Sequence, residues 1–327
     1  MSLAPPVAAC RRAVRAALAD LEPGSTVAVA CSGGADSLAL LAATVFECRR
    51  PALRVVGVTV DHGLQAGSAA HAAAVAAQMA DLGAAETHVV PVSVGSTGGP
   101  EAAARTARYA ALAGAAGRYA VSVVLLGHTR DDQAETVLLG LARGAGARSL
   151  SGMAPAAGLY RRPFLSLSRA DTVAACRAEG LAFWTDPHND DPSFARVRVR
   201  RTVLPVLERE LGPGVTEALA RTARLLRADA DALDDLAAGA LIRADQGAGR
   251  FTVAVLLAEP DAIRSRTLRL AALAAGCPAT ELFLVHVDAL DALLVDWHGQ
   301  GPVQLPGHVT AARSGGTLTI ARSPVGR

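Results

Sequence analysis

Short runs rich in β-branched residues alternate with alanine-rich stretches of helical periodicity through the first part of the sequence. Residues 26–30, 54–60, 87–94 and 121–126 are predicted as strands, and residues 37–49, 68–82, 101–119 and 131–143 as helices. Regular strand–helix alternation predicts an α/β fold, with helices on both faces of a parallel sheet. Such a sheet binds its ligand beyond the carboxyl ends of its strands.

The pattern changes after residue 200. Residues 203–211, 217–242, 261–275 and 281–295 are predicted as helices, with a strand near Phe251 and a hairpin over residues 303–321 that turns at Ser314-Gly315-Gly316. Residues 144–155, rich in glycine, alanine and serine, are predicted as a loop. We therefore predict two domains, residues 1–212 with the parallel sheet and residues 213–327 with a smaller, mostly helical α+β fold.

Composition excludes several classes of protein. The sequence contains no lysine, so all 32 basic residues are arginine. A Walker A loop and a pyridoxal enzyme each require a lysine, and both are excluded. The five cysteines include no CxxC pair, which predicts reduced thiols and a cytoplasmic location. Neither a signal peptide nor a membrane span is expected, because no apolar run approaches about 18 residues.

The segment between the first predicted strand and helix carries the strongest signal for chemistry. It reads Ser32-Gly33-Gly34-Ala35-Asp36-Ser37. Its glycines allow a turn that points amide groups at one centre, beside the positive end of a helix, and phosphate oxygens fit such a centre. A carboxylate beside phosphates requires a cation, so Asp36 predicts Mg²⁺. The alternative is a tight turn that only caps the next helix.

A second motif, residues 127–136, opens a predicted helix with Thr129 as its N-cap. His128, Asp132 and Glu135 are spaced three and four residues apart, which brings them close together. Ordinary helix capping explains these acids equally well. Elsewhere, Arg105 follows Glu101 by four residues, the spacing of a surface ion pair. His62 ends a predicted strand and is interpreted as a structural group.

These motifs together resemble one family. The hexapeptide is similar to the signature of the PP-loop ATP pyrophosphatases, and nearly the whole chain resembles tRNA(Ile)-lysidine synthetase. The resemblance is carried by residues 60–64 (VDHGL), the helix from Glu101 to Tyr109, residues 127–136 (GHTRDDQAET), residues 184–189 (WTDPHN) and the arginines from Arg196 to Arg201. Two positions depart from the family pattern: Gln65 replaces a common arginine, and Val197 a frequent asparagine.

The resemblance implies ATP and Mg²⁺ as cofactors and roles for particular residues. The hexapeptide would bind ATP, with Asp36 as the metal ligand. The implied catalytic residues are Asp36, Arg105, His128 and Asp132; His128 and Asp132 would face the ATP, and Arg105 would contact a phosphate or the adenylate. Asp132 and Glu135 would receive the lysine amine.

The densest basic stretch holds Arg196, Arg198, Arg200 and Arg201, with Arg161 and Arg162 as a further pair. With a net charge of only +2, a nucleic acid must be bound by such a local patch. Arginines bind phosphate bidentately, and the stretch is predicted to contact a transfer RNA backbone. The alternative is a solvated face paired with Glu208, Glu210 and neighbouring acids.

The implied reaction adenylates the C2 oxygen of the wobble cytidine in tRNA(Ile) with a CAU anticodon. The ε-amine of free L-lysine then replaces AMP and forms lysidine. The carboxyl-terminal domain would bind the transfer RNA, and a homodimer is left open.

Two alternatives remain for the function. One is another PP-loop enzyme that thiolates transfer RNA or amidates a nucleotide. The missing CxxC counts against thiolation, and the chain has no room for an ammonia-generating domain. The other is a non-catalytic nucleotide- or RNA-binding module.

Overall fold

The structure is a computed structural model that describes residues 3–63, 67–93, 95, 100–144, 146–186 and 190–323. The chain divides into two compact units, Met1–Leu226 and Arg227–Arg327. This division falls inside the continuous helix α10 (Val215–Ala244). The domain boundary after residue 212 stays a prediction, since a helix that crosses the division belongs to neither unit alone.

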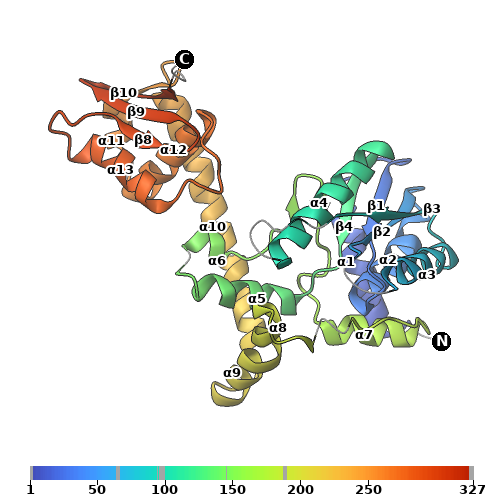
Figure 1. The fold of residues 1–327 in the computed structure, drawn as a ribbon. Helices are drawn as coiled ribbons and strands as arrows, with labels where there is room; N and C mark the ends of the chain where they lie inside the picture. Colours follow the sequence, from blue (N-terminus) through green and yellow to red (C-terminus); the bar gives the residue numbers. More distant parts are fainter. Residues whose placement is uncertain are drawn as a thin grey trace. The chain divides into compact units, whose positions relative to one another are not determined.

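The first unit is built on a six-stranded sheet in the order β3-β2-β1-β4-β6-β5 (Figure 1). Its strands are β1 (Thr26–Ala30), β2 (Arg54–Asp61), β3 (Glu86–Pro91), β4 (Val121–Leu126), β5 (Ala156–Ala157) and β6 (Tyr160–Arg161). All neighbouring pairs are parallel except the short edge pair β5–β6. The predicted α/β fold with a parallel sheet is therefore confirmed.

Helices cover both faces of this sheet. The helices of the first unit are α1 (Pro5–Ala17), α2 (Ala35–Cys48), α3 (Ser68–Asp81), α4 (Pro100–Arg118), α5 (Arg130–Leu141), α6 (Ala147–Leu150), α7 (Arg169–Ala178), α8 (Ala195–Arg198), the π-helical turn η2 (Val199–Val203) and α9 (Leu204–Glu210). Of these, α5, η2 and α9 pack together in a separate small core. In β1, Val27 and Val29 join a core with α1, α2, α3 and α7, whereas Ala28 joins a second core with α4. This two-residue alternation explains why an almost entirely apolar strand is buried on both sides.

Part of this unit differs from the sequence prediction. The segment 144–155, predicted as a loop, contains the short helix α6 (Ala147–Leu150), whose first turn closes through a hydrogen bond of 3.1 Å from Leu150 N to Gly146 O. Local hydrogen bonds formed this helix where composition had indicated only a loop. No prediction was made for α1 or α7, yet both pack against α2 in the first core.

The second unit has a four-stranded antiparallel sheet in the order β7-β10-β9-β8, packed with helices that include the last part of α10. Its elements are β7 (Arg250–Thr252), α11 (Val253–Leu257), α12 (Asp261–Ala274), α13 (Leu284–Val295), β8 (Val303–Leu305), β9 (Val309–Ser314) and β10 (Thr317–Arg322). The predicted hairpin that turns at Ser314-Gly315-Gly316 is found as β9 and β10, and residues 303–305 add a third strand, β8. Gly307 and His308 have φ values of +75° and +59°, which turn the chain once more before β9.

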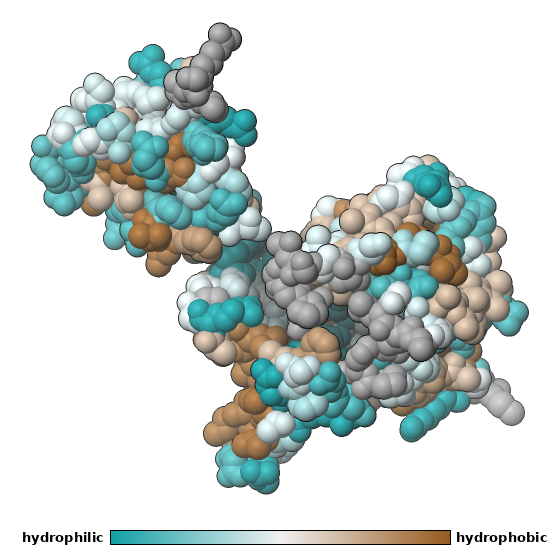
Figure 2. Space-filling view, viewed as in Figure 1, coloured by the Kyte–Doolittle hydropathy of each residue, from teal (hydrophilic) through white to brown (hydrophobic). Residues whose placement is uncertain are grey.

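The surface of the second unit is mostly hydrophilic with apolar areas (Figure 2). Phe283, Leu284 and Val285 are among its exposed apolar side chains, with exposed fractions of 62%, 72% and 66%. No helix in the described part of the chain is long and apolar enough to cross a membrane.

Candidate active site

The loop between β1 and α2 folds through its own serines and glycines. Ser37 Oγ donates a hydrogen bond of 2.9 Å to Gly34 O and accepts one of 3.2 Å from Ser32 N. Gly33 has a φ of +82°, and a Cβ there would lie 2.7 Å from Val75 Cγ2. Within the described residues no side chain caps the start of α2, so its first N–H groups can face a phosphate.

Neighbouring segments hold this loop from outside. Trp184 N donates a hydrogen bond of 2.9 Å to Gly33 O, and His71 Nε2 lies 3.1 Å from Ser32 O. Gly127, just after β4, approaches so closely that a Cβ on it would lie 3.1 Å from the backbone carbon and oxygen of Asp36. The glycine that opens the second motif is therefore required by close packing on the first.

Asp36 lies in the first turn of α2 and contacts α7. Thr172 Oγ1 donates to Asp36 Oδ1, and Arg169 Nε donates to Oδ2 at 3.3 Å. Burial raises the pKa of Asp36 and the nearby Asp132 charge adds to this, although Arg169 and Thr172 act in the opposite direction. A cation at this carboxylate is therefore electrostatically favourable.

The donor set around Asp36 fits Mg²⁺ bound together with a nucleotide. No group of three His, Cys, Asp or Glu side chains among the described residues forms a complete metal site. Mg²⁺ needs none, because it usually keeps waters and takes one or two carboxylates plus substrate phosphates. Asp36 and the adjacent phosphate-facing turn match that ligand set.

Asp132 uses its two carboxylate oxygens differently. Oδ2 accepts hydrogen bonds of 2.7 and 3.0 Å from the backbone N–H and hydroxyl of Thr129, so it caps α5 as the capping alternative predicted. Oδ1 accepts from Arg169 Nη2 at 3.1 Å and from Arg200 Nη2 at 3.4 Å. Burial opposes ionisation, but Arg169, Thr129, His128 and Arg200 outweigh it and keep the pKa of Asp132 low.

Glu135, one helical turn further along α5, forms the deepest part of the site. Arg200 Nε and Nη2 donate to its two oxygens at 2.6 and 3.1 Å, and Arg196 Nη1 lies 3.7 Å from Oε2. Burial raises the pKa of Glu135, and Arg200 opposes that shift. Side-chain exposure falls from 22% at Asp36 to 11% at Asp132 and 0% at Glu135. Asp36, beside the turn of residues 32–37, is thus the most exposed of the three carboxylates, and Glu135 is the most buried.

Three arginines, Arg108, Arg162 and Arg105, act on His128 through their positive charge. Burial lowers the pKa of His128 to about 3, and the charges of Arg108, Arg162 and Arg105 add to the shift despite the opposing charge of Asp132. His128 is therefore neutral at physiological pH. Among the described residues, neither His128 Nδ1 nor Arg108 Nε has a hydrogen-bond partner. This part of the site favours an anion.

Arg105 is exposed on α4, with its guanidinium 5.0 Å from the centre of the Tyr109 ring. Arg162 also reaches this ring, because its Nη2 donates a 3.2 Å hydrogen bond to the Tyr109 hydroxyl. The alternative ion pair with Glu101 concerns a side chain outside the described part of the structure.

The arginine stretch 196–201 divides between two environments. Arg196 and Arg200 face Glu135, whereas Arg198 is exposed and donates to Pro192 O and Ser193 O at 2.6 and 2.8 Å. Arg201 is also exposed and pairs with the exposed Asp190. Only Arg198 and Arg201 therefore match a solvent-facing surface.

The solvated-face alternative holds only for neighbouring acids, since Arg201 pairs with Asp190, whereas Glu208 and Glu210 have other partners among the described residues. Glu208 instead accepts backbone hydrogen bonds from residues 214–216, and Glu210 pairs with Arg209. Arg161 and Arg162 do not form a common patch either. Arg161 pairs with Asp20, and Arg162 donates to Ala154 O at 2.9 Å.

Sequence reasoning missed Arg169, Thr172 and Arg108. The first two lie in the opening turn of α7, for which no helix had been predicted. A signal was present, since Ser168 and Asp171 form a capping box around Arg169. His62 was interpreted as structural, and its Nδ1 is buried without a partner among the described residues. Gln65, Pro187, His188 and Asn189 lie outside the described residues.

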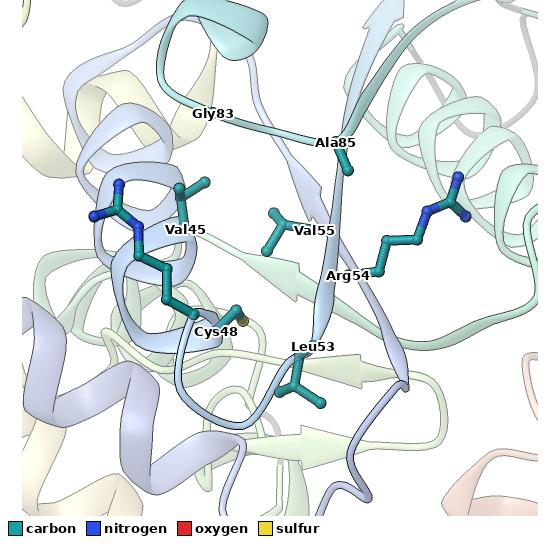
Figure 3. Close-up of a pocket in the computed structure, with 8 residues that line it drawn as sticks. Val45, Cys48, Leu53, Arg54, Val55, Gly83 and Ala85 are labelled. Atoms are coloured by element: carbon teal, nitrogen blue, oxygen red, sulfur yellow. The ribbon is translucent and has the colours of Figure 1, made fainter.

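A pocket of about 190 Å³ lies away from this site (Figure 3). It is lined mainly by apolar groups such as Val45, Leu53 and Val55 near the amino end of β2. Arg54 points away from it in Figure 3 and pairs with Glu86. Because ligands of a parallel sheet bind at the carboxyl ends of its strands, we do not assign this pocket to the function.

Comparison with known proteins agrees with the geometry. Residues 8–207 match the family model described as a PP-loop domain, and residues 251–319 match one described as the TilS substrate binding domain. The U34-tRNA thiolase NcsA from Methanococcus maripaludis, solved with its [4Fe-4S] cluster, has a TM-score of 0.56 and 19% identity. That likeness covers 68% of this chain and 80% of the thiolase, and it concerns the fold alone. The first unit is thus a PP-loop domain of the ATP-binding type.

Relatives over the full chain make the assignment narrower. A tRNA(Ile)-lysidine synthase from Thermobifida fusca is 56% identical, covering 97% of this chain and 98% of the relative. Another from Streptomyces coelicolor is 55% identical, with 90% and 84% covered, and one from Salinispora arenicola is 53% identical, with 98% and 97% covered. The chain belongs to the tRNA(Ile)-lysidine synthase family. This membership favours the predicted ligase over the other PP-loop enzymes and over a non-catalytic module.

Proposed function

We propose that this protein adenylates the C2 oxygen of the wobble cytidine in tRNA(Ile) with a CAU anticodon and then replaces AMP with the ε-amine of L-lysine. The C2 oxygen bonds to the α-phosphorus of ATP and pyrophosphate leaves. The amine nitrogen next bonds to C2 while the C2–O bond breaks and AMP departs. The observation that supports the proposal is the series of carboxylates Asp36, Asp132 and Glu135, which begins at the turn of residues 32–37 and suits a cation-binding region beside a nucleotide.

The nucleotide half of the site is residues 32–37 with Asp36. Amides of the turn and the hydroxyl of Ser32 can donate to phosphate oxygens, and the Ser37 hydroxyl can do so only if it gives up its hydrogen bond to Gly34 O. Mg²⁺, when bound at Asp36, neutralises phosphate charge. The buried carboxylate favours such a cation, because its pKa is raised by burial.

The amine half of the site is Asp132 with Glu135. Asp132 stays ionised because its pKa is low, so it attracts the lysine ammonium. The ammonium must lose one proton before its nitrogen can attack C2, and Asp132, which binds it, is our candidate to assist that loss. After the nitrogen bonds to C2, its next proton is acidic enough for a weakly basic carboxylate to accept. The deeper Glu135 is paired with Arg200 and thereby holds that guanidinium beside Asp132.

The cationic side of the site receives the developing negative charge. Arg105 and Arg108 lie on α4, and their positive charges act on neutral His128. We assign Arg105 to a phosphate or the adenylate. Neutral His128 can donate a hydrogen bond without adding charge.

The transfer RNA is held by exposed arginines and by the second unit. Arg198 and Arg201 present their charge to solvent, which suits phosphate contacts. The family model for substrate binding matches residues 251–319, within the second unit. The wobble cytidine must be unstacked to enter the site, and this is easiest in an anticodon loop. Buried, unpaired cysteines are consistent with a cytoplasmic location. A homodimer stays a prediction.

Mass analysis of isoleucine transfer RNA after incubation with protein, ATP, Mg²⁺ and lysine tests the proposal. We expect the mass of the anticodon fragment to rise by one lysine residue only when all components are present. Pyrophosphate release with transfer RNA but without lysine would identify the adenylation step. If ATP binds but neither pyrophosphate nor lysidine forms, the non-catalytic module is the better description.

A further inference from the structure

Arg169 connects two carboxylates that belong to different halves of the site. It is the first residue of α7, and its backbone N–H donates a 2.8 Å hydrogen bond to Asp131 Oδ2. Its side chain then donates from Nε to Asp36 at 3.3 Å and from Nη2 to Asp132 at 3.1 Å. One guanidinium thus spans α2 and α5, while its own backbone is fixed to α5.

The opening turn of α7 is docked on the phosphate-facing loop by other contacts as well. Thr172 Oγ1 donates to Asp36 and also to Arg169 O, the latter at 2.8 Å. Cys176 Sγ lies 3.3 Å from Ala35 O. Because these groups fix the helix, the guanidinium has little freedom to leave one carboxylate while keeping the other.

The acceptor capacity of the two carboxylates shows why this bridge matters. An ionised carboxylate has about four acceptor positions. At Asp132 the two donors of Thr129, together with Arg169 and Arg200, occupy all of them. At Asp36, Thr172 and Arg169 occupy two, so acceptor capacity remains there. An ammonium that binds Asp132 must take a position from an arginine.

We propose that Arg169 is a positioning residue that couples the nucleotide half of the site to the amine half by holding Asp36 and Asp132 on one guanidinium fork. The inference rests on the proposed function. A cation that reaches either carboxylate changes how strongly Arg169 holds the other. Its loss leaves two neighbouring carboxylates without the charge between them, and they repel.

The test compares Arg169→Gln, which removes the charge, with Arg169→Lys, which keeps the charge but not the two-armed fork. Arg177→Gln is the matched control, because Arg177 is an exposed arginine on the same helix. For each full-length variant we would measure KM for ATP, KM for lysine and Tm. We expect Arg169→Gln to raise both KM values about tenfold, Arg169→Lys to raise them less, and the control to match the wild type.

A double variant gives a readout that does not need turnover. Adding Asp132→Asn to Arg169→Gln removes one of the two repelling charges, so ATP affinity by calorimetry and Tm should both recover in part. If the losses of ATP affinity and Tm in the two single variants simply add in the double variant, the bridge is overturned. It is also overturned if Arg169→Gln raises only one of the two KM values, or if its KM values equal those of the Arg177→Gln control. If Arg169→Gln does not fold, unchanged KM values in Arg169→Lys overturn it instead.

Failure of the proposed function is a separate result. In that case the wild-type protein forms no lysidine, and the thermal cycle between Arg169 and Asp132 still decides whether the bridge exists. If the wild type is active but the cycle is additive, the proposed function stands and the coupling role fails.

Discussion

Replacing Arg200 with methionine should destabilise the first unit strongly, because it leaves a fully buried carboxylate without its main partner. Glu135 has a side-chain exposure of 0% and accepts from Arg200 Nε and Nη2 at 2.6 and 3.1 Å. Methionine keeps the volume of the arginine stem and removes only the charged fork. Arg196 then remains at 3.7 Å from Oε2, and the charge of Arg169 also acts on Glu135.

The expected loss follows from these contacts. Removing one partner of a buried ion pair costs about 3–5 kcal/mol. Because Arg196 still compensates part of the charge of Glu135, we expect a loss of stability at the lower end of this range, about 3 kcal/mol. In a unit of this size about 1 kcal/mol shifts Tm by about 2–4 °C, which gives a fall of about 6–12 °C.

Thermal unfolding followed by circular dichroism measures this loss, with Arg201→Met as the control. Arg201 pairs with Asp190 at an exposed site, so its replacement should cost below about 1 kcal/mol. Burial already raises the pKa of Glu135, and losing Arg200 raises it further. A raised folded-state pKa means stability is lost as pH rises, so the deficit of Arg200→Met should be larger at neutral pH than near about pH 5. Equal Tm values for the two variants would refute the reasoning.

Four further outcomes follow from the site. Gly127→Ala should cost about 1–3 kcal/mol and weaken ATP binding in calorimetry, because its Cβ would lie 3.1 Å from backbone atoms of Asp36. Asp36→Asn should abolish pyrophosphate release without lowering Tm, and full activity would remove its metal role. Changing Arg198 and Arg201 together to alanine should weaken transfer RNA binding and reduce its salt slope by about 2, which filter binding at several salt concentrations measures. The folded state lowers the pKa of Asp132, so the ionised Asp132 stabilises the fold at any pH above the pKa that it has in the unfolded chain. The Asp132→Asn variant lacks this contribution and should therefore lose less stability than the wild type as pH falls below about 5.

Much of the first unit could be predicted because local and tertiary signals agree there. The strand Thr26–Ala30 and the strand Val121–Leu126 have the predicted bounds. Both are short, apolar and bounded by turn residues, and the sheet buries them on both faces. For the short helix α7 the sequence offered only the capping box of Ser168 and Asp171. The importance of this helix lies in its contacts with residues that are distant in the sequence.

The candidate site was predicted in its parts but not in its connections. The hexapeptide, Asp132 and Glu135 were identified from residue types and spacing, and their roles remain proposals. The arginine stretch looked like one basic surface, yet Arg200 turns inward to Glu135 while Arg198 stays exposed. Spacing along an irregular segment does not say which side faces the protein, since η2 departs from the α-helical period.

The sequence alone determined the glycine-containing turn of residues 32–37 and the parallel sheet that presents it. Both depend on short-range chemistry: glycines that permit the turn, and apolar runs that two-sided burial requires. Only the tertiary structure decided that Arg169, Asp36 and Asp132 form one network, because these residues meet across separate helices. Charge pairing at that distance in sequence is set by how α2, α5 and α7 pack, and no local pattern encodes it.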